Sequence, residues 1–170
     1  MTIEENNRAD IGKQASIDGF AHEHIVVGIL MKKYQNVSLV NLPLSSYDII
    51  IARKTENVDE ENIIRVQVKT ARKSVSFTGG TRGGVDRTYK SDVKTYTQSP
   101  LTSDVIIGIT PLENNESYDL YIIPTILINQ WNAKSKSIGQ LQLLKNNYDF
   151  LENCKNHEYI MSKAIEMRLI

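Results

Sequence analysis

The chain has 170 residues, of which 41% are hydrophobic, and its 20 basic and 20 acidic side chains leave no net charge. This length is typical of one domain that buries a hydrophobic core without staples, so we expect a single domain over residues 1–170. Cys154 has no second cysteine to pair with, and no cysteine and histidine cluster has zinc-ligand spacing. No apolar run approaches the roughly 20 residues that cross a bilayer, and residues 1–10 lack the pattern of a secretory signal. We therefore expect a soluble, cytoplasmic protein without a membrane partner.

Positive charge gathers in the segment 65–94, although the chain as a whole is neutral. This segment holds eight lysine and arginine residues against two aspartates, an excess of +6. One interpretation is an exposed loop that happens to be basic, and the other is a surface for the phosphates of a nucleic acid. Charge alone does not choose between them.

The first periodic segment, 17–34, predicts an amphipathic helix. Its apolar residues recur at three- and four-residue intervals. They are Ile17, Phe20, Ala21, Ile25, Val27, Gly28, Leu30 and Met31. Ser16 or Asp18 is expected to cap the start of this helix, because both side chains accept hydrogen bonds from free backbone N–H groups.

Two strands are predicted next, at 47–53 and 63–71. The first is dense in isoleucine, which is typical of a buried strand. The second alternates between apolar and polar residues, so its side chains divide between two faces. One face carries Arg65, Gln67 and Lys69, and the other carries Ile64, Val66 and Val68. We expect these strands to form a hairpin across the polar connection 54–62.

Further short elements follow in the second half of the chain. Residues 75–77 predict a short strand, and the four glycines of 78–85 indicate a turning loop that lacks the spacing of a nucleotide-binding fingerprint. Segments 105–109 and 120–123 predict two core strands joined by a polar turn. After Pro124, helical spacing over 138–154 and 159–169 predicts a helical C-terminal part.

Asp48, Gln67 and Lys69 are the candidates for chemistry. Magnesium prefers oxygen ligands, and the Asp48 carboxylate, the Gln67 amide oxygen and the Val68 carbonyl would supply three. Lys69 beside the metal would orient the attacking water and neutralise charge that develops on a phosphate. The alternative is that Asp48 is a turn or cap residue and that the polar face of the second strand is merely solvated.

These motifs together resemble the PD-(D/E)xK nuclease superfamily, in the branch that has glutamine in place of the second acid. The resemblance rests on a helix with Glu23, on Tyr47-Asp48 opening an isoleucine-rich strand, and on the strand 65–71 that reads Arg-Val-Gln-Val-Lys-Thr-Ala. It covers roughly residues 19–124. It implies an α/β fold with a restriction-endonuclease-like core, in which a mixed β-sheet is flanked by helices. It also implies hydrolysis of DNA phosphodiester bonds with Mg²⁺.

The resemblance assigns a role to each matching residue. Asp48 takes the place of the metal ligand, Gln67 that of the second ligand, and Lys69 that of the catalytic lysine. Glu23 takes the place of the auxiliary acid on the first helix. The chain departs from the family at Tyr47, where a proline is usual, and at Gln67. The missing negative charge weakens metal affinity unless Glu23 compensates for it.

We therefore expect a type II restriction endonuclease that cuts double-stranded DNA with Mg²⁺, or with Mn²⁺ as a substitute, as a homodimer and without a nucleotide cofactor. The nuclease core would span about 17–124, with extra C-terminal helices over about 125–170. A homing endonuclease, a Holliday-junction or repair nuclease, and a non-catalytic DNA-binding or subunit-interaction module are the alternatives. The residues expected to contact DNA are Arg72, Lys73, Arg82, Arg87, Lys90 and Lys94.

Overall fold

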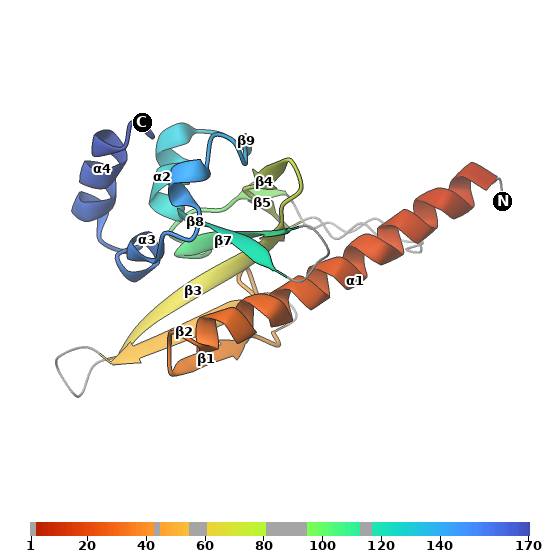
Figure 1. The fold of residues 1–170 in the computed structure, drawn as a ribbon, viewed down its shortest axis with the longest axis horizontal. Helices are drawn as coiled ribbons and strands as arrows, with labels where there is room; N and C mark the ends of the chain where they lie inside the picture. The colour runs from red at the N-terminus through yellow and green to blue at the C-terminus, as the bar shows by residue number, and fades with distance from the viewer. Residues whose placement is uncertain (1–2, 43–44, 55–60, 81–94, 113–116) are drawn as a thin grey trace.

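The computed structural model describes residues 3–42, 45–54, 61–80, 95–112 and 117–170. Within these ranges it shows a five-stranded mixed sheet in the order β1-β2-β3-β7-β8, with a long helix along one part and short helices beside β8 (Figure 1). The sheet strands are β1 (Asn36–Leu39), β2 (Ile49–Lys54), β3 (Glu61–Thr70), β7 (Val105–Pro111) and β8 (Tyr118–Pro124). The expected α/β class, a mixed sheet flanked by helices, is confirmed.

The predicted hairpin is confirmed as the antiparallel pair β2–β3, with Ile49 opposite Val66. Its faces also agree with the prediction. Ile64, Val66 and Val68 are at most 6% exposed, because they face the hydrophobic core. Arg65, Gln67 and Lys69 point the other way and are partly exposed.

The two later core strands are confirmed as well, and they make the sheet mixed. Strand β7 runs parallel to β3, with Val66 opposite Val105, and β8 returns antiparallel to β7. The side chains of Ile106, Ile107 and Ile109 are fully buried. The parallel step requires a long crossover between β3 and β7, which contains β4 (Ser74–Ser76), β5 (Thr78–Gly79) and β6 (Tyr96–Thr97).

The first helix differs from the prediction at its start, because α1 spans Ile3–Met31. Neither proposed cap residue acts as one. The Ser16 hydroxyl donates to the Gly12 carbonyl, and the Asp18 carboxylate accepts from the Gln14 amide, all within the helix.

The apolar stripe expected on this helix is also partly wrong. Ile17, Phe20 and Met31 are 61%, 65% and 55% exposed, whereas Val26 and Leu30 are completely buried. The reason is that α1 contacts β1 and β3, while its N-terminal end extends away from the sheet (Figure 1). Ile17 and Phe20, which precede the buried Val26, therefore have no core to face, whereas this reason does not account for Met31 at the other end of the helix.

The predicted helix at 138–154 is wrong. This region contains the 3-10 turn η2 (Gln142–Leu144) and the short helix α3 (Tyr148–Glu152) instead. Asn146 separates them in the left-handed backbone region, with φ of 51°. Its side-chain oxygen accepts from the N–H of Leu120 at 3.0 Å, and its own N–H donates to the Leu120 carbonyl. These bonds to β8 hold a turn where local periodicity predicts helix.

The remaining elements complete the C-terminal part. Helix α4 (His157–Glu166) agrees with the predicted helix at 159–169, whereas α2 (Thr125–Trp131) and β9 (Ser135–Ser137) were not predicted individually. Strand β9 pairs with β4, and α2 packs on α4. In the described ranges, no helix has both the length and the apolar character needed to span a bilayer.

Candidate nuclease site

Asp48 lies at the end of the β2–β3 hairpin and is bound to β3 by its main chain and its side chain. Its N–H donates to the Val66 carbonyl at 2.8 Å, and its Oδ2 accepts from the N–H of Val68 at 2.7 Å. Strand β2 begins only at Ile49. The Asp48 carboxylate therefore adds one more hydrogen bond to the series that joins β2 to β3. The N–H and C=O of one strand residue point to the same side, so the Val68 carbonyl faces the same edge as this carboxylate.

Gln67 contacts both of these oxygens, but it does so with its nitrogen. The Gln67 Nε2 donates to the Asp48 Oδ2, and it lies 3.2 Å from the Val68 carbonyl oxygen. The Gln67 Oε1 instead accepts from the Nε2 of Gln98 at 3.0 Å. We expected the oxygen to face a metal. Ligation of a metal by Gln67 would require a half-turn of this amide, and it stays a prediction.

Lys69 is a partly buried cation close to two carboxylates. Burial lowers the pKa of its ammonium, because a low-dielectric environment disfavours the charged form, and the nearby Asp48 and Glu23 carboxylates act in the opposite direction. The hairpin and α1 thus bring one positive and two negative groups within electrostatic reach of one another. This is the combination that the sequence predicted for the site.

Glu23 reaches this site because α1 is held against the end of β3. The Nδ1 of His22, one residue before Glu23, lies 2.8 Å from the Oγ1 of Thr70, one residue after Lys69. Glu23 and Asp48 also line one cavity of about 640 Å³, together with Phe20, Leu42, Tyr47 and other residues of α1 and of the segment before β2. Glu23 of α1 and Asp48 before β2 therefore lie on the same cavity.

The oxygens at this position fit a hard divalent cation. In the described part of the chain, no three His, Cys, Asp or Glu side chains form a metal-binding group. A cation at Asp48 would therefore draw on neutral oxygens as well as on acids. The Asp48 and Glu23 carboxylates and the Val68 carbonyl are the oxygens that could hold such a cation, with water in the remaining positions.

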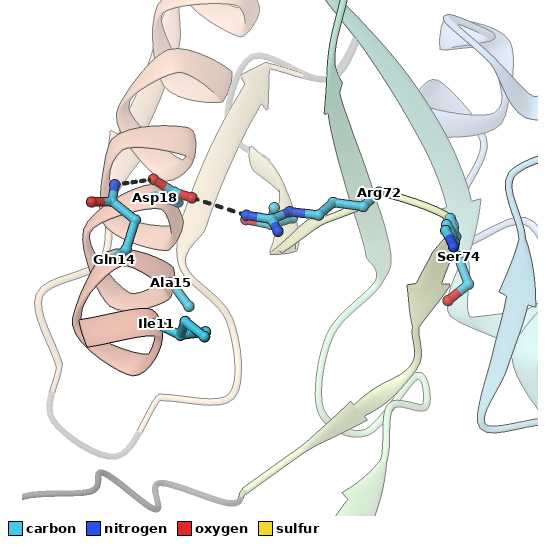
Figure 2. Close-up of a pocket in the computed structure, with 8 residues that line it drawn as sticks. Ile11, Gln14, Ala15, Asp18, Arg72 and Ser74 are labelled. Atoms are coloured by element: carbon cyan, nitrogen blue, oxygen red, sulfur yellow. Dashed lines mark hydrogen bonds and ion pairs between the residues drawn. The ribbon is translucent and has the colours of Figure 1, made fainter. Parts of the chain in front are cut away.

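Of the residues expected to contact DNA, the structure describes Arg72 and Lys73. Both are exposed and line a cavity of about 480 Å³ between α1 and the start of β4. Figure 2 shows the Arg72 guanidinium directed across this cavity to Asp18, with 3.4 Å between the Nη2 of Arg72 and the Oδ2 of Asp18. The other four residues, Arg82, Arg87, Lys90 and Lys94, lie outside the described residues.

Sequence reasoning missed Gln98, which donates a hydrogen bond to Gln67 of the site. It follows β6, is 0% exposed, and contacts Gln67 directly. A polar residue next to a short, irregular segment carries no periodic signal. Only its burial next to Gln67 reveals a role.

No family model matches this chain, and no curated protein matches it. Among solved structures, it is similar to a bacterial homing endonuclease, I-Ssp6803I, with a TM-score of 0.48 and 15% sequence identity. The similarity covers 72% of this chain and 76% of that chain. A function for the present chain has to be argued from the arrangement of Asp48, Val68, Lys69 and Glu23.

Proposed function

We propose that this protein is a Mg²⁺-dependent endonuclease that hydrolyses phosphodiester bonds of double-stranded DNA. The observation that carries the proposal is the partly buried Lys69 within reach of the Asp48 and Glu23 carboxylates. A strand whose polar face is merely solvated has no need to bury a lysine, because burial of an ammonium costs free energy. The Asp48 and Glu23 carboxylates offset that cost here.

Each residue has a distinct task in this proposal. The Asp48 and Glu23 carboxylates and the Val68 carbonyl would hold Mg²⁺, which when bound polarises the phosphate and makes a coordinated water more acidic. The Lys69 ammonium donates hydrogen bonds to the attacking water or to a phosphate oxygen, and its charge stabilises the transition state. Its lowered pKa favours proton exchange with that water.

The test is cleavage of supercoiled plasmid or phage DNA with Mg²⁺, with Mn²⁺ and with EDTA. We expect cleavage with either metal and none in EDTA. Asp48→Ala and Lys69→Ala should each lower the cleavage rate by about 100-fold or more, since each removes a charged group from the reacting centre. Lys145→Ala is the matched control, because Lys145 is paired with Asp119 on the surface, at 3.3 Å. Cleavage in EDTA, or parental rates in a folded Lys69→Ala variant, would contradict the proposal.

Type II restriction is the specialisation that we favour, with a homodimer as the active form. One such site cuts one strand, and a two-fold pair cuts both strands of a short symmetric sequence. Mapping of the cut ends distinguishes the alternatives. A short symmetric site supports restriction, a single long site supports homing, and cutting at junctions supports repair. Sedimentation of the active species should give twice the chain mass of 19.3 kDa, and an active monomer would contradict the dimer.

A non-catalytic DNA-binding or interaction module remains the competing function. It predicts that DNA is bound but not cut under every metal condition, and that Lys69→Ala changes stability alone. The cleavage experiment therefore separates the two functions directly.

A further inference from the structure

Gln98 is a completely buried glutamine whose amide is saturated with hydrogen bonds. Its Nε2 donates to the Ser46 carbonyl at 3.1 Å and to the Gln67 Oε1 at 3.0 Å. Its Oε1 accepts from the hydroxyls of Thr102 and Ser103. A side-chain amide offers two donor hydrogens and two acceptor positions, so all four are used.

The orientation of the Gln98 amide follows from the Ser46 contact. A carbonyl oxygen can only accept, so the Gln98 nitrogen, and not its oxygen, must face Ser46. A flipped amide would place two oxygens against each other in a buried position, which is unfavourable because both are left without a donor. The nitrogen therefore stays on the side of Ser46 and Gln67.

The orientation of the Gln67 amide follows in turn. Because Gln98 presents an N–H, Gln67 has to present its oxygen to Gln98. Its own nitrogen then points at the Asp48 Oδ2 and the Val68 carbonyl, as the structure shows. A half-turn of Gln67 would set its NH₂ group against the NH₂ group of Gln98, donor against donor.

We propose that Gln98 is a positioning residue that holds the Gln67 amide with its nitrogen toward Asp48. Gln67 then serves the proposed centre as a hydrogen-bond donor to the Asp48 carboxylate, and its oxygen is kept away from a bound metal. A cation at Asp48 and Val68 has to displace the Gln67 N–H. The role of Asp48 as a cation ligand rests on the proposed function, whereas the orientation of the Gln67 amide rests on its hydrogen bonds.

The orientation is tested by NMR on the metal-free protein in EDTA, without DNA. The Gln67 side-chain N–H and the Val68 backbone N–H point at the same Asp48 oxygen, so a nuclear Overhauser effect should connect them. We expect this effect in the parent and a weaker one in Gln98→Met, which keeps the length of the side chain but removes the amide: the Asp48 and Val68 oxygens still accept from the Gln67 nitrogen, but no donor fixes the Gln67 oxygen. Gln140→Met, which removes an exposed glutamine near β9, should leave it unchanged. Its absence from the parent, or its persistence at full strength in a folded Gln98→Met variant, would overturn the proposal.

A second measurement uses Mg²⁺ itself, by isothermal titration calorimetry. Gln98→Met removes the hydrogen bond that holds the Gln67 oxygen, so the Gln67 amide can turn this oxygen toward the cation. Mg²⁺ should then bind about fivefold more tightly, the equivalent of one hydrogen bond of about 1 kcal/mol. Equal or weaker binding in a folded Gln98→Met variant would show that Gln98 does not restrain Gln67 against the metal.

If Gln98→Met fails to fold, Gln98→Asn replaces it. Asparagine keeps an amide but is one methylene shorter, so it cannot span the Ser46 carbonyl and Gln67 together, and the same weakening of the Overhauser effect is expected. Failure of the proposed function gives a different result. A protein that neither binds Mg²⁺ nor cuts DNA, yet shows the predicted Overhauser effects, refutes the nuclease assignment and leaves the role of Gln98 intact.

Discussion

Asp48 and Asp104 illustrate how two similar aspartates acquire different roles. Each immediately precedes an isoleucine-rich strand. Asp104 is 5% exposed, and its carboxylate accepts from the Arg65 guanidinium at 2.8 Å and 3.2 Å and from the Arg65 backbone at 2.7 Å. Lys155 adds a second cation at 3.7 Å. The Asp48 carboxylate instead accepts from the amides of Gln67 and Val68, lies near the Lys69 ammonium and lines a cavity, as a group at a reacting centre would.

A change of Gln67 to glutamate tests how strongly the centre responds to charge. Gln67→Glu keeps the side-chain length and adds one negative charge beside Asp48. Mg²⁺ should bind about 10-fold more tightly or better, because a hard cation gains from each carboxylate nearby. Without metal, like-charge repulsion should lower the melting temperature, so Mg²⁺ should raise it more than in the parent. Calorimetry and thermal unfolding measure both effects.

The control for this change is Gln140→Glu, which adds the same charge at an exposed position near β9. It should leave Mg²⁺ affinity at the parental value. Affinity in Gln67→Glu that equals the parent would mean that a cation does not bind next to residue 67.

At the scale of elements, α1 connects the candidate site to the exposed basic residues Arg72 and Lys73. Its buried residues Val26 and Leu30 fix the helix on the sheet, and Glu23 and Asp18 lie on the turns before them. Asp18 pairs with Arg72, whose side chain is 77% exposed. An exposed ion pair is worth only about 0–1 kcal/mol, so a DNA phosphate can compete with Asp18 for this arginine.

Two substitutions at this ion pair should change DNA affinity in opposite directions. Arg72→Ala should weaken binding and reduce the slope of log K against log salt by about 1, because one phosphate contact is lost. Asp18→Asn releases Arg72 and should strengthen binding by about twofold to fivefold. Fluorescence anisotropy at several salt concentrations measures both quantities in Ca²⁺, which replaces Mg²⁺ to prevent cutting.

Lys163→Ala is a matched control, because Lys163 is paired with Glu166 on α4 rather than with a residue near β3. It should give the parental slope. A parental slope in Arg72→Ala as well would mean that Arg72 does not contact a DNA phosphate.

At the scale of the whole molecule, the hydrophobic core joins the sheet to the helices of the C-terminal part. It includes Ile122 of β8, Leu127 of α2, Phe150 of α3 and Ile160 of α4. Cys154, which follows α3, belongs to this core and is 2% exposed. Burial raises the pKa of its thiol from 9.0 to about 12.

This thiol reports on unfolding of the core. Since the raised pKa belongs to the folded state, the stability it contributes is fully present below about pH 9 and is lost as pH rises toward 12. At pH 8 a disulfide reagent should react with Cys154 in the native protein far more slowly than in denaturant, at a rate that follows unfolding. Immediate reaction of the native protein would place the thiol outside the core. Cys154→Ala should lose less stability than the parent between pH 9 and pH 11.

The sequence by itself determined the central strands and the short motif of the site. Strands β2 and β3 were predictable because burial of one face imposes an alternation that neighbouring residues record, and β7 and β8 were predictable from their apolar runs. The same alternation placed Gln67 and Lys69 on one face of β3, and the structure brings Gln67 into contact with Asp48, whereas their roles in catalysis stay predictions. The two faces of β3 and the mixed α/β class agree with the structure.

Only the tertiary structure decided features that depend on partners distant in the chain. The turn at Asn146 exists because Leu120 on β8 supplies its hydrogen bonds, and local periodicity alone predicted a helix there. Residues 10–16 of α1 are exposed or only partly buried, so they left no apolar pattern to detect. Gln98 determines which atom of Gln67 faces Asp48, across 31 residues of chain. Local patterns record whether a side chain is buried, whereas the identity of its partner is set by the folded chain.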